Sequence, residues 1–109
     1  MKQEKKFIKK IADIMRSLGH PTRMDIFILL SSNERKKMSV TQIHEKLGLT
    51  QPETSRHLSI LKNGAVLRCE KEKSNSFYFI NNEDSFIRGL SNCIGEDLKG
   101  NNSESQKLK

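Results

Sequence analysis

The chain has 109 residues, the length of one domain, and can bury only a modest hydrophobic core. No apolar run is long enough to span a bilayer, and the lysine-rich start lacks the apolar segment of a secretory signal. The formal net charge of +7 favours a polyanionic partner such as nucleic acid, although solubility alone would also account for it. Cys69 and Cys93 form no CxxC motif and no disulfide framework, which suits the reducing cytoplasm.

The first two predicted elements are helices. Residues 4–18 carry apolar side chains on one face and mostly lysines on the other, the pattern of an amphipathic helix. A second helix begins at Pro21, because the missing N–H of proline costs nothing in a first turn. Residues 24–30 are apolar nearly all round, so we expect this helix to lie at the centre of the domain.

A short strand at 38–40 precedes two helices that are separated by a glycine. Thr41 is the predicted N-cap of the first helix, which ends at Gly48. Thr50 is the predicted N-cap of the second helix, because Glu53 stands three residues further on, at the spacing of a capping box. A helix, a tight turn and a second helix form a helix-turn-helix arrangement.

Residues 65–80 are predicted to form two strands joined by a polar turn at 72–76, a β-hairpin. The segment 81–100 has apolar residues at helical spacing, and 101–109 is a polar tail predicted to be disordered. The predicted fold class is therefore mainly α (α+β): a winged helix-turn-helix with about five helices and a two-stranded β-wing. The predicted DNA-binding domain, with its terminal dimerisation helices, spans 1–100.

The sequence at this point resembles the ArsR/SmtB family of bacterial transcriptional repressors. The resemblance is carried by "LGHPTRMDIFILL" (18–30), "SVTQIHEKLGLTQPETSRHLSILKNGAVL" (39–67) and "FYFIN" (77–81). It implies a sequence-specific DNA-binding regulator and a homodimer whose first and last helices pair across a two-fold axis. Two recognition helices, the second helix of each helix-turn-helix, would then meet successive major grooves of a pseudo-palindromic operator in double-stranded DNA.

The outward face of the recognition helix is the predicted DNA-binding surface. Arg56 and Gln51 have the donors for guanine and adenine edges, and Ser55 and Ser59 can reach bases or phosphates. The family places Ser55 and His57 at or beside the DNA. The alternative for a helix of this composition is an ordinary solvated face. The predicted contacts are Gln51, Pro52, Thr54, Ser55, Arg56, His57, Ser59 and Lys62.

The wing is predicted to contact phosphates through Lys71, Lys73, Ser74 and Asn75. The family often carries Gly-Arg at the tip, where the arginine reaches the minor groove. Lysine neutralises a phosphate but lacks the guanidinium fork, so the resemblance does not extend to base readout here. The pair Gly64-Ala65 also departs from the usual Ala-Gly of the family, and we expect the turn into the wing to be shifted by one residue.

Two amphipathic terminal helices carry more apolar surface than one small core needs, which supports a dimer independently of the resemblance, although both helices could also pack on the monomer. The predicted dimer interface consists of Phe7, Ile8, Ile11, Ile14, Met15, Phe86, Leu90 and Ile94.

No cofactor and no metal site are predicted. The family's sensing cysteines correspond here to Ser39 and Thr41, whose neutral hydroxyls are poor ligands for soft metals, and the last helix contains no histidine. A redox-responsive repressor that uses Cys69 and Cys93 is one alternative. The others are that both cysteines are small buried hydrophobes, or that the regulator has no ligand at all.

The sequence does not predict an enzyme. It has no glycine-rich phosphate loop, no nucleophile elbow and no paired carboxylates. Ser55 and His57 stand two apart on a helix and point about 200° apart, so they cannot share a proton. A winged helix that binds only proteins is the remaining alternative, and the basic charge of the wing and recognition helix argues against it.

Overall fold

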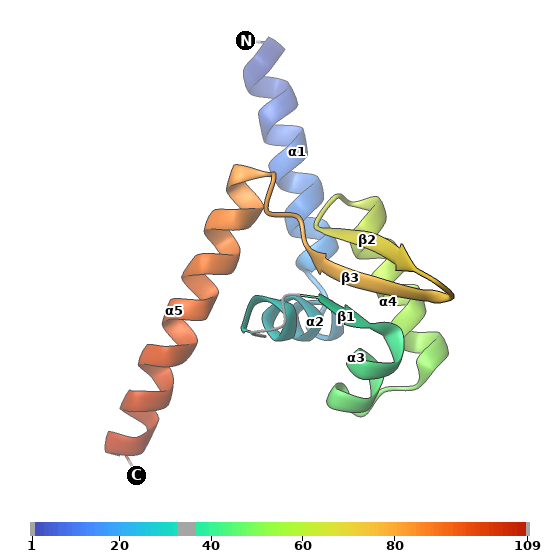
Figure 1. Ribbon diagram of the computed structural model, residues 1–109. Helices are drawn as coiled ribbons and strands as arrows, with labels where there is room; N and C mark the ends of the chain where they lie inside the picture. The colour runs from blue at the N-terminus through green and yellow to red at the C-terminus, as the bar shows by residue number, and fades with distance from the viewer. Residues whose placement is uncertain (1, 33–36, 109) are drawn as a thin grey trace.

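The computed structural model describes residues 2–32 and 37–108, with side chains up to residue 97 (Figure 1). Its helices and its small antiparallel sheet confirm the predicted winged-helix class, and α5 and the hairpin tip lie on opposite sides of the central helices. None of the described helices is long and apolar enough to cross a membrane. The elements are α1 (Lys2–Leu18), α2 (Pro21–Ser32), β1 (Lys37–Ser39), α3 (Val40–Leu47), α4 (Gln51–Asn63), β2 (Leu67–Glu72), β3 (Asn75–Ile80) and α5 (Ser85–Leu108).

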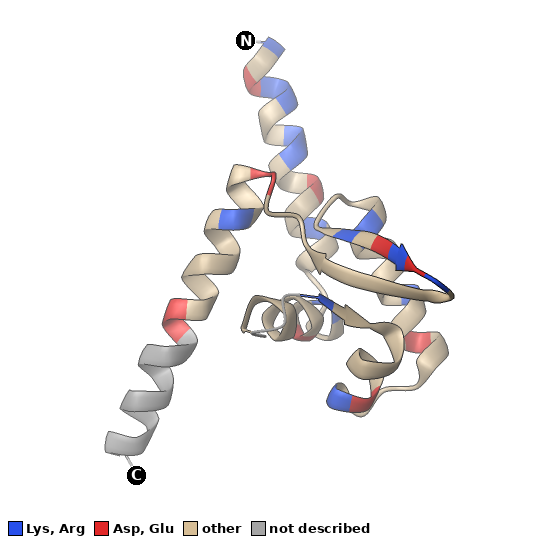
Figure 2. Ribbon diagram, viewed as in Figure 1, with Lys and Arg blue, Asp and Glu red and all other residues tan. Residues whose placement is uncertain are grey.

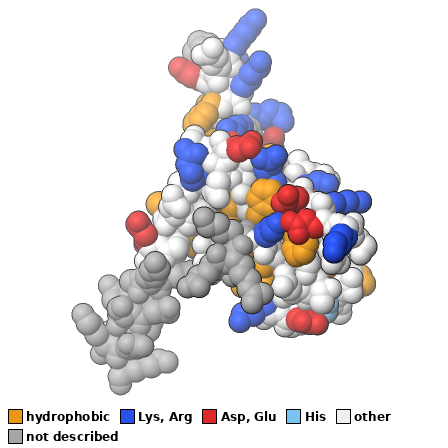
Figure 3. All heavy atoms as spheres, in the orientation of Figure 1, with side chains coloured by type: hydrophobic (Ala, Val, Ile, Leu, Met, Phe, Trp, Pro, Cys, Tyr) orange, Lys and Arg blue, Asp and Glu red, His pale blue; other side chains and the backbone are white. Residues whose placement is uncertain are grey.

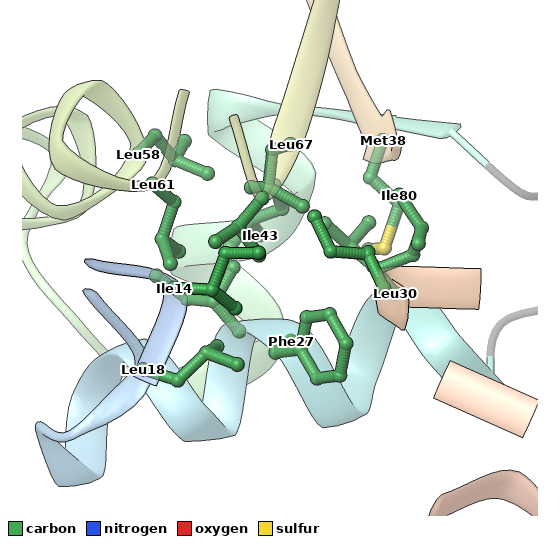
Figure 4. Packing of buried hydrophobic residues seen from close by; sticks show 13 residues of the cluster. Ile14, Leu18, Phe27, Leu30, Met38, Ile43, Leu58, Leu61, Leu67 and Ile80 are labelled. Atoms are coloured by element: carbon green, nitrogen blue, oxygen red, sulfur yellow. The ribbon is translucent and has the colours of Figure 1, made fainter. Parts of the chain in front are cut away.

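The helix α2 forms the centre of the fold, as its nearly uniform apolar sequence predicts. Ile26 and Phe27 are fully buried, and α2 contacts α1, α3, α4, α5 and β3. Figure 4 shows side chains from α1, α4 and β2 converging on Phe27. The buried hydrophobic cluster contains Ile14, Leu18, Ile26, Phe27, Leu30, Met38, Ile43, Leu58, Leu61, Val66, Leu67, Ile80 and Ile87.

The sheet has three strands in the order β1-β3-β2, all antiparallel. The third strand, β1, contains the strand predicted at 38–40 except for its last residue, which belongs to α3. The hairpin turn is tighter than predicted, because Glu72 pairs with Asn75 and only Lys73 and Ser74 lie between them. Lys73 adopts the left-handed backbone conformation, with φ of 58°.

The helix α3 begins earlier than the sequence suggests. Its N-cap is Ser39, whose Oγ accepts a hydrogen bond from the N–H of Gln42 at 3.2 Å. The Gln42 side chain in turn accepts from the N–H of Ser39 at 2.9 Å, which completes a capping box. The predicted N-cap at Thr41 is therefore wrong. A capping box needs a side-chain acceptor three residues after the cap, and Gln42 provides one for the N–H of Ser39. The residue three after Thr41 is His44, which has no such side-chain carbonyl.

The predicted start of α4 is confirmed. Thr50 is its N-cap and accepts from the N–H of Glu53 at 3.2 Å, with Pro52 in the first turn. The turn before it is made by Gly48, whose φ of 69° places it in the left-handed region that favours glycine. Its N–H bonds to the carbonyl oxygen of His44, so Gly48 ends α3 as predicted.

The turn from α4 into the wing runs through Gly64 and Ala65, and Ala65 adopts the left-handed conformation with φ of 62°. The expected shift of this turn relative to the family stays a prediction. The N–H groups of Ala65 and Val66 bond to the carbonyls of Lys62 and Leu61, each at 3.0 Å. These two bonds form the Schellman motif that commonly closes a helix, and they hold Ala65 in its strained conformation.

The helix α5 starts after Asp84, whose Oδ1 accepts from the N–H of Ile87 at 3.0 Å. Lys10 of α1 forms an ion pair with the other carboxylate oxygen of Asp84 at 2.5 Å, so α1 is tied to the start of α5. The helix α5 continues to Leu108 and so includes residues 101–108. The disorder expected of this tail from its composition stays a prediction. A helix that has already started adds residues at little further cost. Residue 109 lies outside the described part of the chain.

Candidate nucleic-acid interface

The helix α4 presents a polar face away from the core. Leu58 and Leu61 are fully buried and hold the helix on the domain. Six of the eight residues predicted to contact DNA lie on the outer surface, where Ser55 is half-buried and the other five are exposed. Their contact with DNA stays a prediction. These six residues are Gln51, Pro52, Ser55, Arg56, Ser59 and Lys62.

The other two predicted contacts, Thr54 and His57, lie inside the domain. Thr54 is fully buried and its hydroxyl donates to the carbonyl oxygen of Thr50 at 2.9 Å, whereas His57 is only 4% exposed. The prediction that these side chains face DNA is therefore wrong. The residue spacing 54, 57, 58 and 61 is that of one helical face, and the two leucines on it already mark that face as inward.

His57 is surrounded by basic groups. Its ring centroid lies 4.7 Å from that of His20, and its Nδ1 lies 3.4 Å from Nη1 of Arg23. Burial is the main reason why the pKa of His57 is lowered, and the positive charges of His20, Arg23 and Arg56 lower it further. The carboxylate of Glu53 acts in the opposite direction. The environment of this ring therefore favours the neutral form.

The outer face of the hairpin holds its acidic residues in ion pairs. Lys37 of β1 pairs with Glu70 at 3.6 Å and with Glu72, and the hydrogen bond that Lys37 donates to Glu72 is the main reason why the pKa of Lys37 is raised. Arg68 pairs with Glu83 at 2.5 Å. Figure 2 shows basic and acidic residues alternating along β2. Lys37 and Arg68 therefore offset the negative charge of the glutamates with which they pair.

The predicted wing contacts lie elsewhere on the hairpin. Lys73, Ser74 and Asn75 are exposed at the tip. Lys71 is exposed on the other face of β2, the face whose Leu67 is buried in the core. In the strand register Lys71 stands opposite Ser76, which is not among the predicted wing contacts. Ile60 and Asn63 are also exposed on α4, outside the seam of Leu58 and Leu61.

The helix α1 exposes a row of large apolar side chains. Phe7, Ile8 and Met15 are 58%, 65% and 47% exposed. In Figure 3, hydrophobic side chains appear on the same stretch of α1 as the lysines. Ile14 is only 2% exposed, so its prediction as a dimer contact is wrong: it packs in the core of its own chain. Ile11 is half-buried.

On α5, the predicted dimer residues Phe86, Leu90 and Ile94 are partly buried and pack against the edge of the core. They therefore contact their own chain and retain some exposed surface. Their place in an interface between two copies stays a prediction.

The positions relevant to sensing are occupied by groups with other roles. The Ser39 hydroxyl, which replaces a sensing cysteine of the family, caps α3. Cys69 on β2 is half-buried and Cys93 on α5 is exposed, so the alternative of two buried hydrophobes does not hold for Cys93. Both are free thiols. Among the side chains that the structure describes, those of residues 2–32 and 37–97, no group of three or more His, Cys, Asp or Glu residues is arranged to hold a metal ion.

Sequence comparison finds related regulators. A family model described as a helix-turn-helix domain matches residues 18–70. A helix-turn-helix transcriptional regulator from Methanocaldococcus jannaschii is 39% identical over 72 residues, which are 66% of this chain and 79% of that protein. Other matching regulators and repressors align over 69 to 73 residues, and the chain covers 54% to 58% of their length.

Structure comparison finds the same fold. The transcriptional repressor PagR of Bacillus anthracis superposes with a TM-score of 0.69 at 26% identity, over 80% of this chain and 94% of that one. A homodimeric winged helix-turn-helix DNA-binding domain from Mycobacterium bovis, described as a possible ArsR-family regulator, has a TM-score of 0.73 at 18% identity. That match covers 91% of this chain and 87% of the other. The chain therefore belongs to the family of helix-turn-helix transcriptional regulators, which are not enzymes, and its fold is the winged helix found in ArsR-type regulators.

Proposed function

We propose that the chain is a dimeric, sequence-specific DNA-binding repressor of the ArsR type. The observation that carries this proposal is the exposed polar face of α4, a helix with a defined N-cap at Thr50 and a buried seam at Leu58 and Leu61. A helix held in this way projects its outer side chains at a fixed angle, which reading base edges in a major groove requires.

The exposed side chains have the chemistry for both base and phosphate contacts. Arg56 has the paired donors that match O6 and N7 of guanine, and Gln51 has the donor and acceptor that match adenine. The free N–H groups at the start of α4 favour a phosphate. Lys71 and Lys73 of the wing add phosphate contacts, while the paired Lys37 keeps the neighbouring carboxylates from repelling the DNA.

Dimerisation explains the exposed apolar row on α1. Phe7, Ile8 and Met15 would be costly to leave in water, and a second copy of the same helix provides a matching apolar surface. The homodimeric M. bovis domain with this fold supports the arrangement. A two-fold axis would present two α4 helices to half-sites about 34 Å apart, so the proposed operator is pseudo-palindromic. A repressor acts where the DNA is, and we infer the cytoplasm of a prokaryotic cell.

The proposed repressor lacks the cysteine-based metal site expected from its resemblance to the ArsR/SmtB family. Ser39 is engaged as a helix cap and Thr41 carries only a neutral hydroxyl. A thiol switch through Cys69 and Cys93 is less well supported, because the two lie on different elements, β2 and α5, and no described cation pairs with either thiol. Operator binding measured with and without zinc, and with and without oxidant, decides between a ligand-free and a responsive repressor.

The direct test uses labelled duplex DNA from upstream of the gene that encodes the chain. We expect tight binding that weakens steeply as salt rises, by about a thousandfold between low and moderate salt if six or more phosphates are contacted. Arg56→Ala should lose specific binding by about tenfold or more while the protein stays dimeric. Lys9→Gln, on α1 and paired with Asp13, is the matched control. Binding to neither this DNA nor a random duplex, at any salt, would show that the proposed function is wrong.

A further inference from the structure

A cluster of three basic side chains lies behind the exposed face of α4. His57 comes from α4, His20 from the turn between α1 and α2, and Arg23 from the first turn of α2. The two imidazole centroids are 4.7 Å apart, and Arg23 Nη1 lies 3.4 Å from His57 Nδ1. Arg23 also donates its Nε–H to the carbonyl oxygen of Ser17, the penultimate residue of α1, at 2.5 Å. The cluster therefore connects α4 to α1 and α2.

The hydrogen bonds define the protonation state of both imidazoles. A guanidinium group only donates, so Nδ1 of His57, which faces Arg23, must accept. Nδ1 of His20 accepts from the N–H of Thr22 at 3.1 Å. Each ring must therefore carry its single proton on Nε2 and be neutral. A second proton would sit on Nδ1 and would point at the donor that faces this nitrogen, the Arg23 guanidinium for His57 or the Thr22 N–H for His20. It would also add a positive charge beside the guanidinium.

We propose that His20, Arg23 and His57 form a positioning cluster that fixes α4 on the α1–α2 turn, and that the cluster does so only while both imidazoles are neutral. Arg56 precedes His57 in α4, so the cluster sets the orientation from which the Arg56 side chain reaches DNA. DNA binding by the wild-type protein should consequently weaken in mild acid. The predicted effect on DNA binding rests on the proposed function, whereas the predicted effect of pH on the stability of the fold does not.

The charged groups around His57 support this direction of the pH effect. His20, Arg23 and Arg56 are cationic or can become so, and only the carboxylate of Glu53, one turn earlier in α4, favours the charged ring. Since the pKa of His57 is lowered in the folded chain, the unfolded chain binds more protons below the ordinary value of 6.5. The stabilisation is therefore complete above that pH and is lost as the pH falls below it.

His44 provides a matched control. Its Nδ1 lies 3.2 Å from the carbonyl oxygen of Leu49, an acceptor, so His44 keeps this bond when it is protonated. It lies on α3, which contributes no residue to the cluster. Removal of His44 should therefore leave the pH dependence of DNA binding unchanged.

The test measures affinity from about pH 8 to about pH 5 for a duplex that the wild-type protein selects from a random library at about pH 8. We expect specific affinity to fall only once the pH lies below the ordinary histidine value, because burial and the neighbouring cations lower the pKa of His57 in the folded chain. Added positive charge alone would strengthen DNA binding, so a fall in affinity identifies the cluster. His57→Asn, whose amide oxygen can accept from Arg23 and stays neutral, should flatten the profile, and His44→Gln should keep it.

Unfolding by urea across the same pH range provides a second readout. The wild type should lose stability below about pH 6.5, and His57→Asn should lose less. An unchanged wild-type affinity and stability in acid, or the same acid loss in His57→Asn as in the wild type, would overturn the proposal. If no selected or random duplex binds at any pH, the proposed function fails, and the urea series alone decides whether the cluster needs neutral imidazoles.

Discussion

Gly64 at the end of α4 lies directly against Ser17 of α1: a β-carbon on Gly64 would come within 2.3 Å of the Ser17 Oγ. The backbone of Gly64 itself is ordinary, with φ of −82°, whereas the next residue, Ala65, takes φ of 62°. Glycine is thus used here for close approach between two helices, and the left-handed conformation falls on an alanine. The two positions have separate physical requirements, which substitution can distinguish.

Exchanging these residues one at a time should move stability in opposite directions. Ala65→Gly removes left-handed strain but adds freedom to the unfolded chain, and we expect a net gain of about 0.5–1 kcal/mol. Gly64→Ala should lose about 1–3 kcal/mol by overpacking against Ser17. Gly48→Ala is the control, since no atom lies within 4 Å of its added carbon and only its φ of 69° opposes the change. Urea unfolding measures all three; destabilisation by Ala65→Gly would contradict this explanation.

The two candidate caps of α3 can be separated by alanine substitution. Ser39→Ala removes both the accepted bond from Gln42 and the capping-box geometry, and we expect a loss of about 1 kcal/mol. Thr41→Ala should change the free energy of unfolding by less than about 0.5 kcal/mol, because Thr41 is exposed within the first turn. Thermal unfolding of the two variants checks this order, and the reverse order would restore Thr41 as the cap.

The dimer should depend on exposed residues of α1 and not on its buried ones. The double variant Phe7→Gln and Ile8→Gln should produce monomers with an intact fold, because both side chains are more than half exposed within one chain. Light scattering after size exclusion measures the mass, and circular dichroism measures the fold. Ile14→Ala should instead destabilise the chain by about 2–5 kcal/mol through a cavity. A double variant that stays dimeric at micromolar concentration would place the interface elsewhere.

The wing lysines should contribute electrostatically and without base specificity. Lys71→Gln and Lys73→Gln should each lower the slope of log affinity against log salt by about 0.9, with equal effects on specific and random duplexes. Arg56→Ala, in contrast, should affect the specific duplex most. Fluorescence anisotropy over a salt series measures both quantities. An unchanged slope in the Lys71 and Lys73 variants would mean that the wing does not touch phosphate.

Features of the fold that depend on local chemistry could be predicted from the sequence. The start of α4 follows from a threonine cap and a proline in the first turn, and the left-handed Gly48 that ends α3 follows from the glycine itself. The central position of α2 follows from its apolar residues on every side. The predicted exposure of Arg56 is confirmed for the same reason, since it lies on the side of α4 away from the leucine seam, and Gln51 is exposed as the first residue of that helix.

The parts that could not be predicted depend on contacts between distant segments. His57 looks polar in the sequence, but its ring is buried because His20 and Arg23, more than thirty residues earlier, supply polar contacts inside the domain. The left-handed Ala65 is held by bonds to the preceding helix and by the side chain of Asn81, which donates to the Ala65 carbonyl at 2.9 Å. Propensity alone would place glycine there.

Ser39 occupies a junction with a mechanical consequence. It is the last residue of β1, where it stands opposite Phe77 of β3, and it is also the cap of α3. No flexible residue separates the sheet from the first helix of the helix-turn-helix. Strand β3 is also one arm of the wing, so one residue, Ser39, connects the wing strand to the first helix of the helix-turn-helix. A glycine inserted after Ser39 would lengthen this connection and loosen the position of the wing relative to α3.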